Sequence, residues 1–494
     1  MHWCDRTSPR KGNYVYFLAG LNNREGPSNN YYYNYGNPNT TNAPPPSTVS
    51  TPTSAPDGET CSLQGGQYSQ CTADCELMLC ESIPSDLYPA SEIHTMNTTQ
   101  CWLRLIREAK KEIVIGSYYW TLLLNTTAEV TDDLGFAADG KLIFDGLVDA
   151  AKRNISIRIA VSDAKSQGYS YAEPFAIRDV NPQLVRVRSL NFPNWFPYGI
   201  LHTKSWSVDG KHSYVGSANF DWRSLAQVKE LGMAAFNCPC IAEDVQRILD
   251  ILWDMGAENS VLPSSWPTKY STNAHQSSPY VIQGPQGPPT SISLSSSPPG
   301  LNSCGRDNDI DAMVKLIDEA QEYVLLAVME YTPSTAFAKP NFYYDKLDAA
   351  IRRAAYDRFV GVRFLMARWN HTHKTVPSYL KSFEDYSIGL PYTYVNNKKK
   401  QGYIDVKWFE MPDQGFETIP YARVQHNKYF VTDKAAYIGT SNWSADYWLW
   451  TAGIGVTIWS ADAGGQETLW RKAKNIFERD WHSKYAKNVT SPYL

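Results

Sequence analysis

The sequence lacks both a long apolar run and an excess of charge of one sign. A membrane-spanning helix needs about 18–20 apolar residues, and the best N-terminal candidate, residues 15–21, is far shorter. This segment is followed by Asn22, Asn23 and Arg24 rather than by small residues, so it does not have the form of a signal peptide. The 46 basic and 50 acidic side chains leave a net charge of −4, which excludes a polycation that holds nucleic acid through bulk charge. An anionic substrate must therefore be captured locally.

The nine cysteines lack the C-x2-C spacing of a zinc ribbon. They include two tight pairs, Cys71 with Cys75 and Cys238 with Cys240, which are spaced C-x3-C and C-x-C. These spacings favour disulfides over a metal site. Because nine is an odd number, at least one thiol is left over, and its candidates are Cys4, Cys61, Cys80, Cys101 and Cys304.

Sequons for N-glycosylation are frequent and, together with the cysteines, indicate an oxidising lumen. They begin at Asn39, Asn97, Asn125, Asn154, Asn370, Asn442 and Asn488. We expect glycans at Asn97, Asn125, Asn154, Asn370 and Asn488.

Composition divides the chain into four parts. Residues 1–65 are rich in Asn, Tyr, Pro, Ser and Thr without a core-forming period, which predicts a disordered low-complexity arm. Residues 272–303 have the Ser-, Pro- and Gly-rich composition of a linker or surface excursion. They separate two bodies, residues 66–271 and 304–494. Two bodies agree with the chain length, because single cores stop growing near ~250–300 residues.

The two bodies repeat one order of helices and strands. The first has a predicted helix at 101–111, a strand at 113–120, a helix at 141–153 and a strand at 155–161. The second has a predicted helix at 311–323, a strand at 324–331, a helix at 344–356 and a strand at 360–367. We therefore predict an α/β protein with two duplicated domains related by a pseudo-twofold axis. Sites near that axis receive matching residues from both halves.

Each body also ends in the same polar pattern. The first set is His202, Lys204 and Asp209, followed by Gly216, Ser217 and Asn219. The second set is His426, Lys428 and Asp433, followed by Gly439, Thr440 and Asn442. Strand alternation places each His and Lys on one face and the residue between them, Thr203 or Asn427, on the other. Two ordered sets of this kind are not expected by chance from nine histidines.

This set of side chains suits phosphodiester transfer. One imidazole attacks phosphorus covalently, the other protonates the leaving oxygen, and the lysines and asparagines stabilise the phosphoryl oxygens. Side chains supply the positive charge, so we expect neither a metal nor another cofactor. Glu230 follows Asn219, whereas we assign the comparable place after Asn442 to Thr451. A carboxylate bonded to an imidazole orients it and raises its basicity, which favours His202 as the nucleophile.

The doubled HxKxxxxD with G-[ST]-x-N resembles the signature of the phospholipase D superfamily. The longer segments SYYWTLL, LHTKSWSVD, YVGSANFDWRSLAQVKELG and YIGTSNWS resemble the luminal phospholipase D family members three and four. The resemblance extends over residues 71–481 and implies two α/β/α sandwich domains that share one active site. It also implies a lysosomal glycoprotein that degrades single-stranded DNA or RNA from the 5′ end.

The resemblance assigns roles within the motifs. It makes His202 the nucleophile and His426 the general acid, with Asp209 and Asp433 completing the two catalytic motifs. Phosphate would be held by Lys204, Lys428, Asn219 and Asn442. The turns would be supported by Ser217 and Thr440. The resemblance also pairs Cys71 with Cys240 and Cys75 with Cys238.

The sequence departs from this family in three places. The relatives are anchored by an N-terminal transmembrane helix, and this chain shows none. A further disulfide of the relatives is missing, because the strand position is Met366 and no cysteine lies near the C-terminus. Asn442 is both a sequon and a motif asparagine, and we expect it to carry no glycan because a glycan would block the site.

Aromatic residues near the motif strands are candidates for stacking on nucleic-acid bases. They are Tyr119, Trp120, Trp369 and His371. Two other functions stay open. A phospholipase D or transphosphatidylase acting on phospholipids such as phosphatidylglycerol would use the same core, although no amphipathic membrane-binding helix is evident. A catalytically inactive interaction protein is disfavoured because both motifs are complete, and a homodimer is a further option.

Overall fold

The computed structural model describes residues 71–124, 135–163, 172–283, 288–412, 419–460 and 468–489. The predicted arm at residues 1–65, Asn39 and Asn125 lie outside this part of the chain. All of the described residues belong to one compact unit, Thr41–Leu494. Within the described ranges, no helix has both the length and the apolarity needed to span a membrane.

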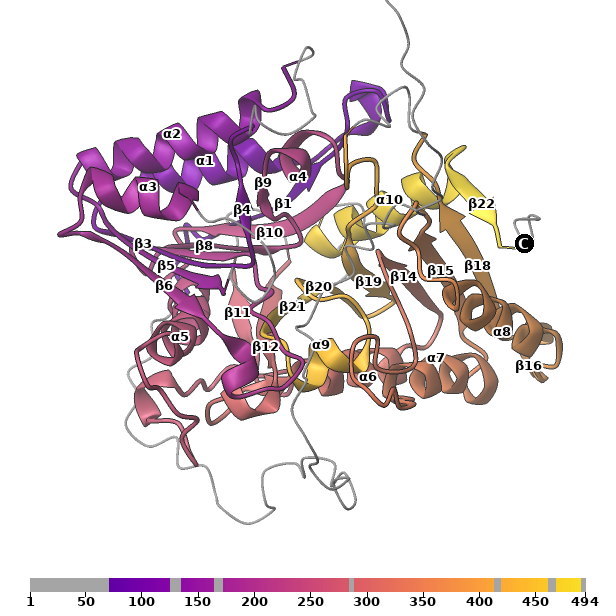
Figure 1. Ribbon diagram of the computed structural model, residues 1–494. Helices are drawn as coiled ribbons and strands as arrows, with labels where there is room; N and C mark the ends of the chain where they lie inside the picture. Colours follow the sequence, from indigo (N-terminus) through magenta and orange to yellow (C-terminus); the bar gives the residue numbers. More distant parts are fainter. Residues whose placement is uncertain are drawn as a thin grey trace, which may run out of the picture. The chain divides into compact units, whose positions relative to one another are not determined.

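The first sheet has the strand order β2-β1-β10-β8-β7-β3-β5-β6. Its strands are β1 Glu76–Ser82, β2 Met96–Asn97, β3 Glu112–Ser117, β5 Ser156–Ser162, β6 Val185–Leu190, β7 Ser205–Val208, β8 His212–Gly216 and β10 Glu230–Phe236. The helices α1 Thr98–Glu108, α2 Ala138–Lys152 and α3 Ala172–Val180 lie on one face, and α5 Pro239–Met255 lies on the other (Figure 1). Strand alternation explains the two layers, because Ile113 and Ile115 pack under α1 and α2 while Val114 packs with α5.

The second sheet has the strand order β11-β12-β21-β20-β19-β14-β15-β18-β22, with β13 paired to β12. Its strands are β11 Tyr280–Ile282, β12 Thr290–Ser297, β13 Asp307–Asn308, β14 Tyr323–Val328, β15 Gly361–Ala367, β18 Tyr403–Phe409, β19 Lys428–Thr432, β20 Ala435–Gly439, β21 Gly453–Ser460 and β22 Ala486–Asn488. The helices α6 Asp309–Glu319, α7 Lys346–Asp357 and α8 Val376–Ile388 lie on one face, and α10 Leu469–His482 lies on the other (Figure 1).

Shorter elements connect these layers. They are η1 Ala90–Glu92, β4 Trp120–Thr121, η2 Phe192–Asn194, β9 Phe220–Asp221, α4 Trp222–Ala226, η3 Thr268–Tyr270, η4 Pro299–Leu301, β16 Tyr392–Val395, β17 Lys398–Gln401 and α9 Ala445–Leu449. A central apolar core joins the inner faces of both sheets with α5 and α10, and each sheet has a second core under its outer helices. The molecule therefore buries apolar residues between the two sheets as well as within each half.

The interpretation of residues 272–303 as a linker or surface excursion does not hold for residues 290–297, which form β12. β12 pairs with β21 over its whole length, from Thr290↔Ser460 to Ser297↔Gly453. Its apolar residues Ile292 and Leu294 are fully buried. The alternating Ile-Ser-Leu-Ser pattern has the period of a strand, but the serines between and after these apolar residues gave the segment a linker-like composition.

In each sheet, two neighbouring strands have a pair of glycines that face each other. Gly216 of β8 faces Gly232 of β10, and Gly439 of β20 faces Gly455 of β21. A Cβ atom on Gly232 would collide with the ring of Tyr214, and a Cβ atom on Gly455 would collide with the ring of Tyr437. A tyrosine ring thus lies across each glycine pair, and only glycine leaves room for it.

Three disulfides join described residues. Cys71 bonds to Cys240 and Cys75 bonds to Cys238, which are the pairs that the resemblance implies. The third joins Cys80 to Cys101, and Cys304 is disulfide-bonded as well. The expectation that Cys80, Cys101 or Cys304 supplies the leftover thiol is therefore wrong. Cys80 on β1 and Cys101 on α1 are adjacent because β1 packs against α1 in the first sheet.

Candidate active site

The two His–Lys pairs lie in one buried site. His202 and Lys204 immediately precede β7, His426 precedes β19, and Lys428 is the first residue of β19. All four are at most 8% exposed. The charges of Lys428 and His426 act on His202, so the second pair lies within electrostatic range of the first. The structure therefore brings the two predicted sets together.

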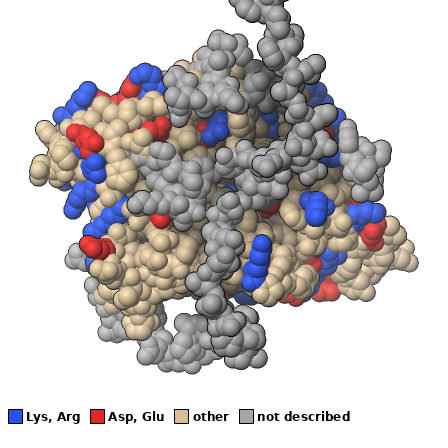
Figure 2. Space-filling view, viewed as in Figure 1, with Lys and Arg blue, Asp and Glu red and all other residues tan. Residues whose placement is uncertain are grey.

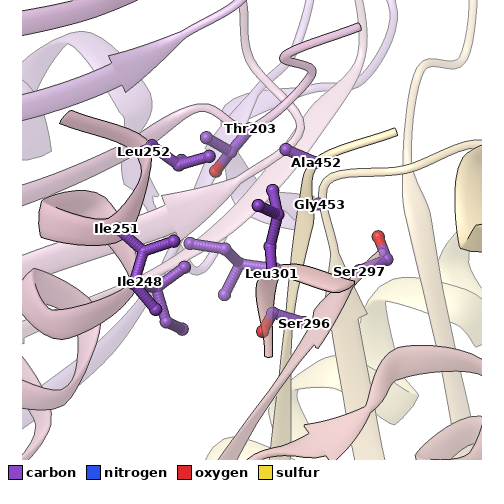
Figure 3. Close-up of a pocket in the computed structure, with 10 residues that line it drawn as sticks. Thr203, Ile248, Ile251, Leu252, Ser296, Ser297, Leu301, Ala452 and Gly453 are labelled. Atoms are coloured by element: carbon purple, nitrogen blue, oxygen red, sulfur yellow. The ribbon is translucent and has the colours of Figure 1, made fainter. Parts of the chain in front are cut away.

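Thr203 faces away from this site, as strand alternation predicts. Its hydroxyl group lies 2.6 Å from that of Ser205, and the residue lines a small cavity of about 10 Å³. Figure 3 shows Thr203 there, with Leu252 of α5 beside it and Ile251 and Ile248 of the same helix along one side. A cavity of this size holds about one water molecule. It is too small for a substrate and shows that the layer behind the His–Lys pair is closely packed.

Each motif histidine is held by the backbone of the other half. The His202 amide donates to the Ala452 carbonyl oxygen at 3.0 Å, and the His426 amide donates to the Lys229 carbonyl oxygen at 2.8 Å. Parallel bridges, Leu201↔Ala452 and Lys229↔Gln425, extend both contacts. The separation between the histidines therefore depends on the contact between the halves.

The two lysines have matching hydrogen bonds. Lys204 Nζ donates to the His202 carbonyl oxygen and Lys428 Nζ donates to the His426 carbonyl oxygen, both at 2.6 Å. Burial lowers the pKa of Lys428 to about 7, and burial with the neighbouring charge of Lys428 lowers the pKa of Lys204 well below its ordinary value. An anion between them would favour their charged forms. The pair is therefore suited to binding a phosphoryl group.

Glu230 does not bond to His202, and the expectation from the sequence is wrong at this point. The Glu230 carboxylate, which is fully buried, contacts Nδ1 of His426 at 2.8 and 2.9 Å. This contact crosses between the halves, since Glu230 belongs to β10 and His426 precedes β19. Burial lowers the pKa of His426 to about 4, and the Glu230 charge opposes that shift. The carboxylate that was expected to favour His202 instead orients His426.

The counterpart of Glu230 in the second half is also not Thr451. Glu230 lies two residues before Gly232, and the residue two positions before Gly455 is Gly453. A Cβ atom on Gly453 would collide with the Ser441 hydroxyl group, so no carboxylate fits there. The two histidines therefore have different surroundings.

His202 lacks such a carboxylate partner. Its Nδ1 is buried without a hydrogen-bond partner among the described residues. The rings of Tyr118 and Tyr447 lie 5.1 Å from the imidazole, centroid to centroid. Burial lowers the pKa of His202 well below its ordinary value, and the charges of Lys204 and Lys428 add to the shift. The sequence indicated Tyr118 only as one of the aromatic residues at the end of its strand, and it did not indicate Tyr447.

The motif asparagines and hydroxyl residues lie at the turns after β8 and β20. Asn219 Nδ2 donates to the Tyr119 hydroxyl oxygen at 3.3 Å, and Asn442 Nδ2 donates to that of Tyr447 at 3.2 Å. Leu231 and Ile454 donate their backbone amides at 3.0 Å to the hydroxyl groups of Ser217 and Thr440, respectively. The hydroxyl residues thus tie each turn to the neighbouring strand, while Oδ1 of both asparagines has no described partner.

The aspartates of the two motifs do not join the site. Asp209 accepts hydrogen bonds from the backbone amides of Lys110, Lys111 and Glu112 at 2.7–2.8 Å. Asp433 accepts from the amides of Gln321 and Glu322 at 2.8 and 3.1 Å. Five residues of extended chain span about 16 Å, so each carboxylate lies far from its lysine. The expectation that the two aspartates are catalytic is therefore wrong. Asp209 binds the turn before β3, and Asp433 binds the turn before β14.

The predicted stacking residues fall into different environments. Trp120 is 1% exposed, stacks on Phe220 at 4.3 Å and donates to the Ser117 hydroxyl group, so the expectation that it contacts a base is wrong. Tyr119 lies next to the site and donates to Asp221 at 2.9 Å. Trp369 and His371 are partly exposed, and their rings contact each other at 4.6 Å.

Trp369 also connects to the lysine region. It packs against a small apolar cluster that includes Val424 and Met329. Met329 Sδ accepts a hydrogen bond from Lys428 Nζ at 3.9 Å. Stacking by Trp369 and His371 therefore stays a prediction for a surface next to the site.

Several sequon asparagines are exposed, whereas Asn442 is not. Asn154, Asn370 and Asn488 have exposed side chains. Asn97 is partly buried and accepts a hydrogen bond from the Thr99 amide at 2.7 Å at the start of α1. Asn442 is 5% exposed, which leaves no access for a glycan in the folded protein.

No cluster of three or more His, Cys, Asp or Glu residues suited to hold a metal occurs in the described ranges. On the face in Figure 2, basic and acidic side chains are interspersed over a largely uncharged surface.

Comparisons with known proteins place this geometry in a family. Residues 90–402 match the family model described as "PLD3/4, PLD-like domain". The chain belongs to this family. A Xenopus tropicalis protein named 5′-3′ exonuclease PLD3 is 37% identical over 85% of this chain and 82% of its own. A Mus musculus protein named 5′-3′ exonuclease PLD4 is 36% identical over 86% of this chain and 82% of its own.

A solved structure supports the fold independently. The crystal structure of phosphatidylserine synthase from Haemophilus influenzae covers 80% of this chain, with 87% of its own length matched, at a TM-score of 0.51. At 13% identity, this likeness concerns the fold alone.

Proposed function

We propose that this member of the PLD3/4 family is a phosphodiesterase that degrades single-stranded DNA or RNA from the 5′ end. The site carries two histidines, two lysines and two asparagines in one buried place, which is the set that phosphodiester transfer needs. The relatives at 36–37% identity are named 5′-3′ exonucleases. The observation that carries the proposal is the pair of backbone bonds that hold His202 and His426 across the two halves.

The two halves are, in this proposal, a duplicated unit with a pseudo-twofold axis through the site. The support is the shared strand order β1-β10-β8-β7-β3-β5-β6 and β12-β21-β20-β19-β14-β15-β18. The paired bonds at Ala452 and Lys229 occupy equivalent places, three residues before Gly455 and Gly232. One active site is then built from both halves, with a boundary near the start of β12.

His426 is the nucleophile in the mechanism that we propose, which reverses the role expected from the sequence. The Glu230 contact fixes the His426 ring through Nδ1 and leaves Nε2 to attack. A bond forms between Nε2 and phosphorus while the bond to the leaving oxygen breaks, and His202 gives that oxygen its proton. His202 then takes a proton from water, the water oxygen attacks phosphorus, and the phosphorus–nitrogen bond breaks. Lys204 and Lys428 stabilise the phosphoryl oxygens in both steps.

The test is cleavage of a single-stranded oligonucleotide with a labelled 3′ end, followed as a ladder that shortens from the 5′ end. The wild type should produce this ladder with EDTA present, and His202→Ala and His426→Ala should each lose at least ~100-fold in rate. His482→Ala, which changes an exposed histidine, is the matched control. An intact oligonucleotide under all conditions would refute the exonuclease, and release of headgroup from phosphatidylglycerol in its place would identify a phospholipase.

The lumen of the lysosome is the compartment that we propose. The support is the set of disulfides and the exposed sequons Asn154, Asn370 and Asn488. Fluorescence microscopy of the tagged protein, with enzymatic removal of N-glycans, checks the compartment and the glycans together.

A further inference from the structure

A further carboxyl group, that of Glu330, lies within electrostatic range of Lys428, and the mechanism above gives it no role. It follows β14, whose last residue Val328 pairs with Lys428 in the antiparallel register. The Met329 amide donates to the Asn427 carbonyl oxygen at 3.0 Å and continues that register by one step. The next step places Glu330 opposite His426, where side chains of facing residues are about 5 Å apart at Cβ.

The first half has a neutral hydroxyl group at the matching place. β3 pairs with β7 through Gly116↔Ser205, so the same register carried forward places Tyr119 opposite His202. The Tyr119 hydroxyl group contacts Asn219, one of the motif asparagines. In this extended register, the strand position opposite each catalytic histidine therefore carries an oxygen-bearing residue, a tyrosine in one half and a glutamate in the other.

Glu330 differs from the other carboxylates around the site because it is unpaired. Glu230 contacts His426, and Asp446 accepts the backbone amides of Phe337 and Ala338 at 3.2 and 3.1 Å. Across the ranges that the structure describes, the Glu330 carboxyl group has neither a hydrogen-bond nor an ion-pair partner. A partly buried carboxyl group without a partner is costly, and a ligand can relieve that cost.

The charges around Glu330 decide which form it takes. The charge of Lys428 on β19 favours the carboxylate, and the charge of Asp446 on α9 disfavours it. The His426–Glu230 pair lies across the strand register from Glu330. Burial, with the charge of Asp446, raises the pKa of Glu330 to about 7 against the opposing effect of Lys428. At pH 5 the group is therefore mainly a neutral acid, and above pH 7 it is mainly an anion.

We propose that the protonated Glu330 carboxyl group donates a hydrogen bond to a nonbridging oxygen of the bound phosphodiester, and that the ionised form excludes the substrate. This inference rests on the proposed function. A group beside His426 cannot activate the water for the second step, because that water must approach phosphorus from the side opposite the phosphorus–nitrogen bond. Contact with a nonbridging oxygen, next to Lys428, is the role that the position allows.

The experiment measures binding of inorganic sulfate by isothermal titration calorimetry between pH 5.5 and 8.0. Sulfate keeps its charge over this range, and binding needs no turnover. We expect Glu330→Gln, which keeps a neutral donor, to bind sulfate like the wild type at pH 5.5. At pH 8.0 the variant should bind about tenfold more tightly, because only the wild type must take up a proton at this position. The Glu330 charge also raises the pKa of Lys428, so its removal lowers that pKa and works against the tighter binding expected at pH 8.0.

The control is Glu322→Gln, which removes the same charge from an exposed position before β14 and should bind sulfate like the wild type at both pH values. In steady-state assays on an oligonucleotide, the KM of the wild type should rise above pH 7. The KM of Glu330→Gln should not show this rise. A ratio between wild type and Glu330→Gln that does not change with pH overturns the inference. If the pH-dependent ratio appears but no oligonucleotide is cleaved, the anion site stands and the exonuclease fails.

Discussion

At the residue scale, the two motif histidines have the same sequence context but different partners. The patterns HTK and HNK are equivalent in sequence, so motif reading alone treats the two imidazoles as interchangeable. The structure separates them through Glu230, which contacts His426 and leaves Nδ1 of His202 without a described partner. The sequence contains Glu230, but the contact joins positions 196 residues apart, and no local period indicates it.

Glu230→Gln should lower kcat by about 10–100-fold, because the ring of His426 loses a charged partner. The carboxylate also favours the protonated form of His426, so its removal should lower the pKa of that imidazole further below about 4. Attack requires neutral His426, and the acid limb of the kcat/KM profile should therefore move to lower pH. An acid limb that stays in place, or moves to higher pH, contradicts the assignment.

The covalent intermediate supplies a second residue-scale prediction. With a diester of p-nitrophenol the leaving group needs no proton, so His202→Ala should still form the adduct but hydrolyse it slowly. Peptide mapping by mass spectrometry after an alkaline quench should then find the phosphoryl group on His426. An adduct on His202 in the reciprocal variant His426→Ala would restore the roles expected from the sequence.

At the scale of elements, apolar periodicity predicted the strands and helices near both motifs. The predicted strand at 155–161 is β5, Ser156–Ser162, and the predicted helix at 344–356 is α7, Lys346–Asp357. These elements bury continuous runs or a helical stripe of apolar residues, and that pattern is visible in sequence. β12 was missed because serine, a poor indicator of a strand, occupies most of its buried positions, where Ser295 donates to Asp309 and Ser297 donates to the Thr451 carbonyl oxygen.

The role of the motif aspartates is an element-scale question with a direct test. Asp209→Ala removes the acceptor of three backbone amides at the start of β3 and should lower the free energy of unfolding by about 1–3 kcal/mol. Its kcat should stay within about twofold, because the carboxylate is about 16 Å of strand away from Lys204.

Urea unfolding and steady-state kinetics on the same preparation check both expectations. Asp145→Ala, on the exposed side of α2, is the control for loss of a carboxylate. A loss of kcat by more than about 100-fold with unchanged unfolding would return Asp209 to a catalytic role.

At the scale of the whole molecule, a buried network of charges joins the two halves behind the site. Lys229 Nζ lies 2.7 Å from Asp480 and 3.3 Å from Glu81, and Arg479 lies 2.7 Å from Glu81. The network connects β10, β1 and α10, and Lys229 immediately precedes Glu230. Burial disfavours the charge on Glu81, but the positive charges of Arg479 and Lys229 outweigh the effect of burial. The pKa of Glu81 therefore lies below its ordinary value. The stabilisation from this carboxylate is therefore lost only as the pH falls through that lowered pKa, and it is retained at pH 5.

Lys229→Met should destabilise the protein by about 3–5 kcal/mol, because it leaves two buried carboxylates with a single cation. The double variant Lys229→Met/Asp480→Asn should recover part of that loss. Thermal and urea unfolding check the two, with Lys141→Met as the control for an exposed lysine. Equal stability of the single variant and the wild type would mean that the network contributes nothing measurable.

The backbone bonds from His202 to Ala452 and from His426 to Lys229 have a further consequence for how such a site can diverge. A dimer of identical subunits repeats every substitution on both sides of its axis, so its two histidines keep identical neighbours. Here both sides belong to one chain, and a glutamate at position 230 stands against a glycine at position 453. Covalent connection thus allows each imidazole to specialise for one chemical step. The same connection makes separation of the halves equivalent to inactivation, since each holds the main chain of the other's histidine.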